Sequence, residues 1–203
     1  MSVSVLLASR NTKKLRELRR VVEGAGLTGI DVVGLDEVEP YEEAPETGAT
    51  FEENALAKAR DGAAATGLAC VADDSGIEVD ALNGMPGVLS ARWSGTHGQD
   101  EANVRLVLAQ LGDVPADRRG AGFVSACALV TVSGDEVVVR GEWRGRIIDA
   151  PRGEQGFGYD PIFVPDDEVA GGRTAAELSA VEKDAISHRG KALALLTPAL
   201  TRL

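Results

Sequence analysis

The chain has 203 residues, of which 44% are hydrophobic and 26% charged, as in an ordinary folded globular protein. We expect one domain over residues 1–203, with two lobes. The formal net charge of -11 argues against a nucleic-acid backbone as the main partner, because both would be negatively charged. Neither a run of about 18 apolar residues nor a signal-peptide pattern occurs, so we expect no membrane span and a cytoplasmic location.

A strand, a short polar loop and a basic helix are predicted at the start of the chain. Val3–Ala8 is an apolar, partly β-branched run, and Asn11 or Thr12 can cap the helix that follows. Lys13 and Lys14 lie in its first turn, where the helix dipole disfavours cations by roughly 0.3–1 kcal/mol each unless an anion binds there. We therefore expect a phosphate site at this helix start, with a solvated basic face as the alternative. Its candidate residues are Ser9, Arg10, Asn11, Thr12, Lys13 and Lys14.

An acidic, proline-bearing segment over residues 36–47 separates a second predicted strand, within residues 28–35, from the next helix. Most of its carboxylates are expected to be solvated, but Glu46 comes just before that helix and is kept as a candidate ligand. The helix starts with a capping box from Thr50 to Glu53, so we interpret Glu53 as a cap rather than a ligand.

The stretch Leu68–Gly76, with the sequence LACVADDSG, carries two adjacent carboxylates. Its apolar residues predict a buried strand that ends at Asp73, and we expect Ser75 and Gly76 to form a turn. Ligands of α/β sheets bind at the carboxyl ends of strands, and two like charges side by side favour a cation or a shared proton. The alternative is an Asx turn, in which Asp73 or Asp74 bonds the nearby backbone.

The second half of the chain is expected to add antiparallel strands to parallel ones. A helix is predicted over residues 99–111, and residues 123–132 and 136–140 predict a hairpin that residues 143–148 continue. The result is a mixed sheet flanked by helices, which places the chain in the α/β class. Both cysteines lie in separate apolar runs and are interpreted as buried packing thiols.

Two late stretches carry groups suited to a planar, polar ligand. The segment Pro151–Pro165 combines glycines with three aromatic side chains, and an aromatic face suits a nucleobase. Aromatics that pin the loop to the core are the alternative. Further on, Lys183, His188 and Arg189 are hydrogen-bond donors near a predicted helix start, which again indicates an anion or acceptor atoms on a ligand.

Four stretches, in this order and spacing, together resemble one family, the non-standard purine nucleoside triphosphate pyrophosphatases. These are also called inosine triphosphate pyrophosphatase-like proteins or XTP/dITP diphosphatases. The stretches are Ser9–Lys14, Glu46–Gly76, Gly156–Pro161 and Ala176–Arg189, which reach from the first predicted strand to the last helix. The resemblance implies a long mixed central β-sheet flanked by helices, with two lobes and an active-site cleft between them, and a homodimer.

The resemblance also implies hydrolysis of ITP, dITP or XTP to the nucleoside monophosphate and pyrophosphate, which removes deaminated purines from the nucleotide pool. Asp74 matches the general base, and Glu46 and Asp74 match metal-binding carboxylates, for which Mg²⁺ is the expected cofactor. Ser75 matches a substrate contact, and Asn11 and Lys14 match phosphate contacts. The residues that match the base and sugar pocket are Phe157, Gly158, Tyr159, Asp160, Lys183, His188 and Arg189.

One departure and two alternatives accompany this resemblance. Arg10 and Lys13 stand where the family often has glycine, so their positive charge is expected to compensate for a less close backbone approach to phosphate. The first alternative is a Maf-type nucleotide pyrophosphatase, which shares the general fold and acts on modified pyrimidine or 7-methylguanine nucleotides. The second is a nucleotide-binding module without turnover, which predicts binding with no release of pyrophosphate.

Overall fold

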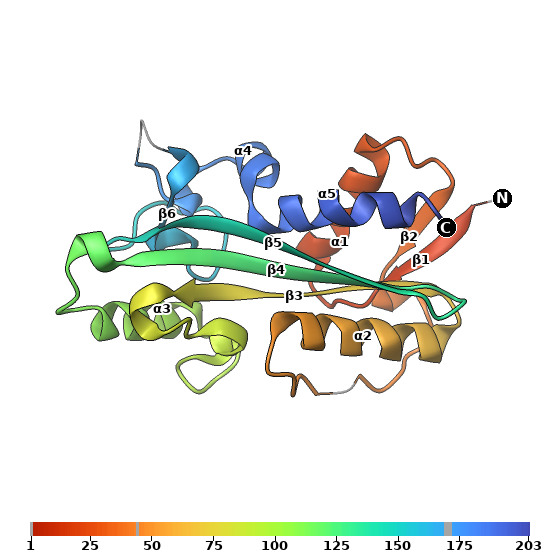
Figure 1. Cartoon of the computed structure of the whole chain (residues 1–203), viewed down its shortest axis with the longest axis horizontal. Helices are drawn as coiled ribbons and strands as arrows, with labels where there is room; N and C mark the ends of the chain where they lie inside the picture. Colours follow the sequence, from red (N-terminus) through yellow and green to blue (C-terminus); the bar gives the residue numbers. More distant parts are fainter. Residues whose placement is uncertain (1, 44, 169–171) are drawn as a thin grey trace. The chain divides into compact units, whose positions relative to one another are not determined.

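The computed structural model of the protein describes residues 2–43, 45–168 and 172–203. Its strands are β1 (Val3–Leu7), β2 (Ile30–Val33), β3 (Ala69–Val79), β4 (Gly120–Val130), β5 (Glu136–Ile147) and β6 (Phe163–Pro165). They form one six-stranded sheet in the order β2-β1-β3-β4-β5-β6 (Figure 1). β1 pairs in parallel with β2 and with β3, whereas β5 and β6 are antiparallel. The mixed sheet predicted from the sequence is therefore confirmed.

The α-helices in the described part of the chain are α1 (Thr12–Gly24), α2 (Phe51–Thr66), α3 (Asp100–Gln110), α4 (Ala180–Ile186) and α5 (His188–Leu200). Asn11 caps α1 and Thr50 caps α2, each side chain accepting a hydrogen bond from a first-turn backbone N–H. Gly67 ends α2 in the left-handed conformation, with φ of 70°. Within the described residues, no helix is long and apolar enough to cross a membrane.

The chain divides into two compact units, each assembled from separate segments. Unit 1 contains the segment up to Asp74, Ser125–Gly141 and Lys191–Leu203, and unit 2 contains Ser75–Val124 and Glu142–Gly190. Each unit has a hydrophobic core of its own. The two candidate sites described below lie in different units.

In unit 1, strand side chains alternate between two helical layers. α1 and α5 cover one face of these strands and α2 covers the other (Figure 1). Val5 and Val71 share a core with Leu18 of α1. The intervening Cys70 faces α2, because a Cβ built on Gly62 would lie 2.5 Å from the Cys70 sulfur. Small residues of α2 therefore allow close packing on the sheet, and both cysteines are buried, as predicted.

Unit 2 is organised around aromatic side chains. Trp143 of β5 and Phe163 of β6 are fully buried, with ring centroids 5.4 Å apart. Phe123 of β4 packs edge-on against Phe163 at 4.8 Å, and Val104 and Val107 of α3 join the same core. Tyr159 and Ile162, from the segment after β5, belong to the same core.

The course of β3 corrects one prediction. The sequence predicted a strand end followed by a turn at Ser75 and Gly76, but β3 continues without interruption. Gly76 serves close packing rather than turning, because a Cβ there would lie 2.3 Å from Ser90 Oγ. Pairing with β1 stops at Val71, so the two aspartates that follow still lie beyond the carboxyl end of β1.

Two further boundaries differ from the predicted ones. The segment predicted to continue the hairpin belongs to β5 itself, which is one strand in the structure. The sequence also predicted a last helix over residues 190–200, whereas α5 begins at His188 and contains Pro198 near its end.

Candidate active site

A group of polar and charged side chains gathers in unit 1 beyond the carboxyl end of β1. β3, the first turn of α1, α2 and the segment before α2 all contribute to it. Three residues predicted from the sequence, Lys14, Glu46 and Asp74, meet here. We call this group the carboxylate cluster, and its members are Lys14, Glu46, Asn54, Lys58, Asp73 and Asp74.

Asp73 and Lys14 form a shielded ion pair. Lys14 Nζ lies 2.7 Å from Asp73 Oδ2, and the two side chains are 15% and 5% exposed. Removing either partner from a pair this buried leaves the other charge uncompensated. Asp73, whose role the sequence leaves open, therefore fixes the position of the Lys14 ammonium group.

Asp74 is held by two side chains of α2. Its Oδ2 accepts a hydrogen bond of 3.0 Å from Asn54 Nδ2, and its Oδ1 lies 3.6 Å from Lys58 Nζ. Burial raises the pKa of Asp74 above the usual value of a carboxyl group, although Lys58 and the Asn54 hydrogen bond act to lower it. The carboxylate is thus both oriented and made more basic than an exposed aspartate.

Glu46 and Asp74 converge on one cationic group. Lys58 Nζ donates a hydrogen bond of 2.8 Å to Glu46 Oε1 as well as facing Asp74. Burial acts to lower the pKa of Lys58, but the carboxylates of Asp74 and Glu46 outweigh it, so the pKa is raised. Nowhere in the described ranges are three or more His, Cys, Asp or Glu side chains grouped to hold a metal ion. A divalent cation bound by these two carboxylates would therefore take further ligands from water or substrate, as Mg²⁺ commonly does.

The sequence did not identify Asn54 and Lys58 as site residues. Both lie at helical spacing from Phe51, on the stripe of α2 that carries its apolar side chains. Polar residues on such a stripe are the signal that would have revealed them. The Glu53 Oε2 accepts a hydrogen bond of 2.6 Å from the Ala49 N–H, so its side chain binds the backbone one residue before the Thr50 N-cap of α2.

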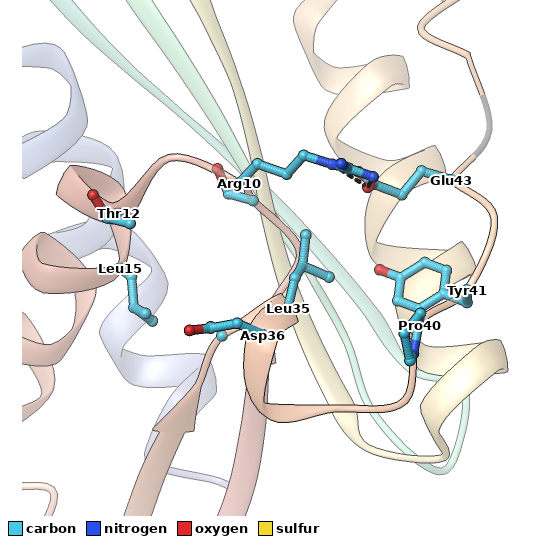
Figure 2. Close-up of a pocket in the computed structure, with 10 residues that line it drawn as sticks. Arg10, Thr12, Leu15, Leu35, Asp36, Pro40, Tyr41 and Glu43 are labelled. Atoms are coloured by element: carbon cyan, nitrogen blue, oxygen red, sulfur yellow. Dashed lines mark hydrogen bonds and ion pairs between the residues drawn. The ribbon is translucent and has the colours of Figure 1, made fainter.

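The loop before α1 already has protein partners. Asn11 Oδ1 accepts a hydrogen bond of 2.9 Å from the Lys13 N–H, so a phosphate contact by Asn11 would use its Nδ2 group. Arg10 is exposed, and its guanidinium lies 2.7 Å from Glu43 Oε1, toward which it extends in Figure 2. Lys13 is exposed as well. Substrate binding by Arg10 would therefore compete with its ion pair to Glu43.

Ser9, Arg10 and Thr12 line a cavity of about 410 Å³ in unit 1. Asp36 and Glu43, from the segment after β2, line it as well, and Glu43 lies against Arg10 (Figure 2). Because both signs of charge face this cavity, it does not by itself indicate a phosphate.

A second pocket, the unit 2 pocket, brings together the predicted base and sugar residues. The aromatic loop Phe157–Asp160 forms one part of its lining. Lys183 of α4, His188 and Arg189 at the start of α5, and Ser75 of β3 form another. The sequence placed these groups in separate stretches, and the fold of unit 2 assembles them around one space.

Asp160 organises the aromatic loop. Its side chain is 2% exposed, and its Oδ2 accepts hydrogen bonds from the Phe157 N–H at 2.9 Å and from Lys183 Nζ at 2.5 Å. Lys183 Nζ also lies 5.3 Å from the centroid of the Phe157 ring. Gly156 has φ of 78°, and a Cβ there would lie 2.0 Å from Asp160 Oδ2, so only glycine allows this arrangement.

His188 and Arg189 place buried donors on the wall of the unit 2 pocket. They are 6% and 7% exposed. The imidazole of His188 stacks on Phe123, with ring centroids 5.0 Å apart and planes inclined by 13°. Arg189 Nη2 donates a hydrogen bond of 3.3 Å to Ser75 Oγ. Buried N–H groups in a pocket with an aromatic wall suit the acceptor atoms of a planar ligand.

Phe123 and Asp100 also line this pocket and were not predicted. Asp100 Oδ2 accepts a hydrogen bond of 2.8 Å from the Gly158 N–H and so helps to fix the aromatic loop. Within the sequence, Phe123 resembles any core residue of a strand, and Asp100 any acidic residue of a first helical turn. Only the tertiary structure assigns them to the pocket.

The acid stability of unit 2 is expected to depend on Glu182, which caps α4. The pKa of Glu182 is lowered from 4.5 to about 2. The largest cause is a hydrogen bond from the Ser179 hydroxyl, followed by one from the Ser179 backbone N–H and by Arg173. This stabilisation is complete above the unfolded-state pKa and is lost as the pH falls toward about 2. Glu182→Gln should therefore be less stable than the wild type in chemical denaturation at pH 6, and the gap should close near pH 2. A gap that stays constant over this range would contradict the assignment.

The chain matches a protein-family model and has relatives of high sequence identity. The Ham1 family model matches residues 5–199. A protein of Mycolicibacterium paratuberculosis named "dITP/XTP pyrophosphatase" is 73% identical over 199 residues, which cover 98% of this chain and 96% of that protein. A protein of Nocardia farcinica with the same name is 71% identical over 199 residues, covering 98% and 95%.

Solved structures with similar names also match the fold of this chain. The structure of a nucleoside-triphosphatase / dITP/XTP pyrophosphatase from Mycobacterium abscessus matches with a TM-score of 0.81 at 65% identity, covering 98% of this chain and 100% of that one. The structure of a HAM1 protein from Coxiella burnetii matches with a TM-score of 0.87 at 40% identity, covering 99% and 100%. The resemblance drawn from the four stretches is thereby confirmed, and the chain belongs to the Ham1 family.

Proposed function

We propose that this protein hydrolyses the non-standard purine nucleoside triphosphates ITP, dITP and XTP to the nucleoside monophosphate and pyrophosphate. The observation that carries the proposal is the order of two consecutive residues on β3. Asp74 belongs to the carboxylate cluster, and Ser75 lines the unit 2 pocket. Unit 1 thus carries groups suited to phosphate chemistry, and unit 2 carries groups suited to nucleoside binding. The name shared by the relatives supports this activity and favours it over a Maf-type enzyme or a module without turnover.

The charge of the carboxylate cluster supports a metal-assisted reaction on a polyphosphate. Its three carboxylates and two ammonium groups leave a net charge of about -1. A divalent cation would make this sum positive, which favours binding of an anionic polyphosphate. Glu46 and Asp74 offer the two carboxylate ligands that a Mg²⁺ site uses together with substrate phosphates. We therefore propose Mg²⁺ as the cofactor, and when bound it would neutralise charge on the phosphates.

Asp74 is the proposed general base. Its pKa is raised by burial, which brings it closer to the working pH, as an effective base requires. Asp74 accepts a proton from the water whose oxygen attacks the α-phosphorus. The bond from the α-phosphorus to the bridging oxygen breaks, and pyrophosphate leaves with the bonding electron pair. Lys14 and the positive end of the α1 dipole compensate for the charge that develops on the leaving group.

Selection of the base is proposed to rest on the purine 6-position. Hypoxanthine and xanthine carry an oxygen acceptor there, whereas adenine carries an amino group. The buried donors of His188 and Arg189 match an oxygen, whereas the amino group of adenine would set a donor against them. The site therefore discriminates by the cost of an unmade hydrogen bond.

We also propose that the protein is a homodimer that acts in the cytoplasm, where the nucleotide pool is found. The family resemblance supports the homodimer, and the proposed nucleotide substrates support the location. Light scattering coupled to size-exclusion chromatography should give twice the mass of the chain. A monomer mass under the conditions of full activity would contradict the dimer.

Measurement of pyrophosphate release tests the proposed function directly. With Mg²⁺, ITP, dITP and XTP should each exceed ATP in kcat/KM by about 100-fold or more, because the amino group of adenine faces buried donors where the other bases present an oxygen acceptor. GTP serves as a second comparison because it shares the 6-oxygen. Removal of the metal with EDTA should abolish turnover, and added Mg²⁺ should restore it. Equal turnover of ATP, or release of orthophosphate in place of pyrophosphate, would overturn the proposal.

A further inference from the structure

Asn54 is a buried residue of unit 1, and both the oxygen and the nitrogen of its side-chain amide form hydrogen bonds. Its residue is 2% exposed. Its Oδ1 accepts a hydrogen bond of 2.7 Å from the Gly48 N–H, and its Nδ2 donates one of 3.0 Å to Asp74 Oδ2. Because the oxygen and the nitrogen each have a partner, the orientation of this amide is fixed. It can therefore hold its two partners at a set position relative to each other.

On the side of Gly48, Asn54 fastens the segment that carries Glu46. A Cβ built on Gly48 would lie 2.7 Å from Asn54 Oδ1, so the backbone of this segment packs directly on the amide. The next N–H, of Ala49, is bound by Glu53 of the same helical turn. Glu46 precedes this double attachment by two residues, which limits where its carboxylate can reach.

On the side of Asp74, Asn54 defines which carboxylate oxygen faces which neighbour. Asp74 Oδ2 is bound by Asn54, and Oδ1 faces Lys58. Lys58 lies four residues after Asn54 on the same face of α2, and it also bridges the Glu46 segment to Asp74. The two bridges differ in chemistry. The Lys58 ammonium is a cation, so its attraction to the carboxylates depends on the other charges nearby, whereas the Asn54 amide is neutral.

We propose that Asn54 is a positioning residue for the hydrolysis: its amide sets the rotation of the Asp74 carboxylate and couples it to the segment that carries Glu46. This inference rests on the proposed function, in which both carboxylates act on one substrate. A carboxylate rotated about its bond to Cβ presents neither oxygen in the required direction, and a misplacement of about 1 Å can cost about 100-fold in rate.

Two substitutions separate the two bonds of the amide. Asn54→Leu has a similar size and removes both hydrogen bonds. Asn54→Asp keeps the acceptor for the Gly48 N–H but puts an oxygen opposite Asp74 Oδ2, so it removes only the bond to Asp74. For each variant, kcat with saturating Mg²⁺ and ITP is measured per folded molecule, and the folded fraction is taken from titration with inosine monophosphate, which the unit 2 pocket should bind.

Both variants should lose about 100-fold in kcat while their affinity for inosine monophosphate stays at the wild-type value. Thr50→Ala is the matched control: it removes the cap of the same helix, whose Oγ1 accepts a hydrogen bond of 3.1 Å from the Glu53 N–H, without touching either carboxylate. It should lower the melting temperature and leave kcat unchanged.

The outcomes are distinct. If Asn54→Asp keeps the wild-type kcat, orientation of Asp74 by the amide is refuted, even when Asn54→Leu is inactive or fails to fold. If Thr50→Ala loses as much kcat as the Asn54 variants, the effect belongs to helix stability and the inference is also overturned. A wild-type protein that releases no pyrophosphate from ITP would instead refute the proposed function, whatever the variants do.

Discussion

Asp74→Asn is expected to lose about 10²- to 10⁴-fold in kcat for ITP, the range typical for removal of a general base. The amide has nearly the same shape as the carboxylate, but it offers one acceptor oxygen where Asn54 and Lys58 each face a carboxylate oxygen, so it can keep only one of these two contacts. It cannot take a proton from water, and it is a poorer ligand for Mg²⁺. Steady-state pyrophosphate release gives kcat, and calorimetric titration with inosine monophosphate shows that the nucleoside pocket is intact.

Asp80→Asn is the control for this substitution. Asp80 follows the end of β3, is 52% exposed and pairs with Arg144 on the surface, so its loss should leave kcat and KM near the wild-type values. An Asp74→Asn protein with more than about a hundredth of wild-type kcat would refute the assignment of Asp74 as the base, since the mechanism requires at least a 10²-fold loss.

His188→Phe is expected to lower the preference for ITP over ATP, expressed as a ratio of kcat/KM values, by about 10- to 100-fold. The imidazole stacks on Phe123 at 5.0 Å and on Trp143 at 6.4 Å, so a phenyl ring retains the aromatic packing. It has no N–H to offer the 6-oxygen of hypoxanthine. The loss should therefore appear in ITP turnover, with ATP little changed, while Arg189 preserves part of the preference.

His188→Ala separates packing from hydrogen bonding in the same assay. Alanine removes both the ring and the donor, so it should lower the ITP to ATP ratio about as much as phenylalanine does but reduce thermal stability further. The ratio for ITP over GTP should stay constant in both variants, because the two bases share the 6-oxygen. An ITP to ATP ratio that does not change in His188→Phe would remove His188 from the selection of the base.

The fold was largely accessible from local patterns. The strand before residue 9, the helix capped by Asn11 and the helix that starts after Thr50 were predicted from apolar spacing and capping residues, and the structure contains them. The turn at Ser75 and Gly76 was wrong because a glycine in a strand has the same local signature whether it turns the chain or lets another segment approach. In this protein the approaching group is Ser90, which is distant in sequence.

The residues of the candidate sites could be predicted from the sequence only in part. Lys14, Glu46 and Asp74 stood out as charges next to predicted element ends, and they do converge in unit 1. The pairing of Asp73 with Lys14, and the bridges made by Asn54 and Lys58, could not be predicted, because they join residues 12 to 59 positions apart and depend on how α1 and α2 pack on β3. Sequence spacing determines which residues share a helix face but not what that face meets.

The unit 2 pocket shows the same division. The sequence by itself determined that a glycine-rich aromatic loop and a Lys, His, Arg group exist, because composition and helix starts are local properties. Only the tertiary structure decided that Asp160 binds Lys183, that His188 stacks on Phe123 and that Arg189 reaches Ser75. In unit 1 it likewise gave the two adjacent aspartates different partners, Lys14 for Asp73 and the α2 pair for Asp74. The physical reason is that neighbouring side chains of a strand point to opposite faces, so residues adjacent in sequence meet different parts of the fold.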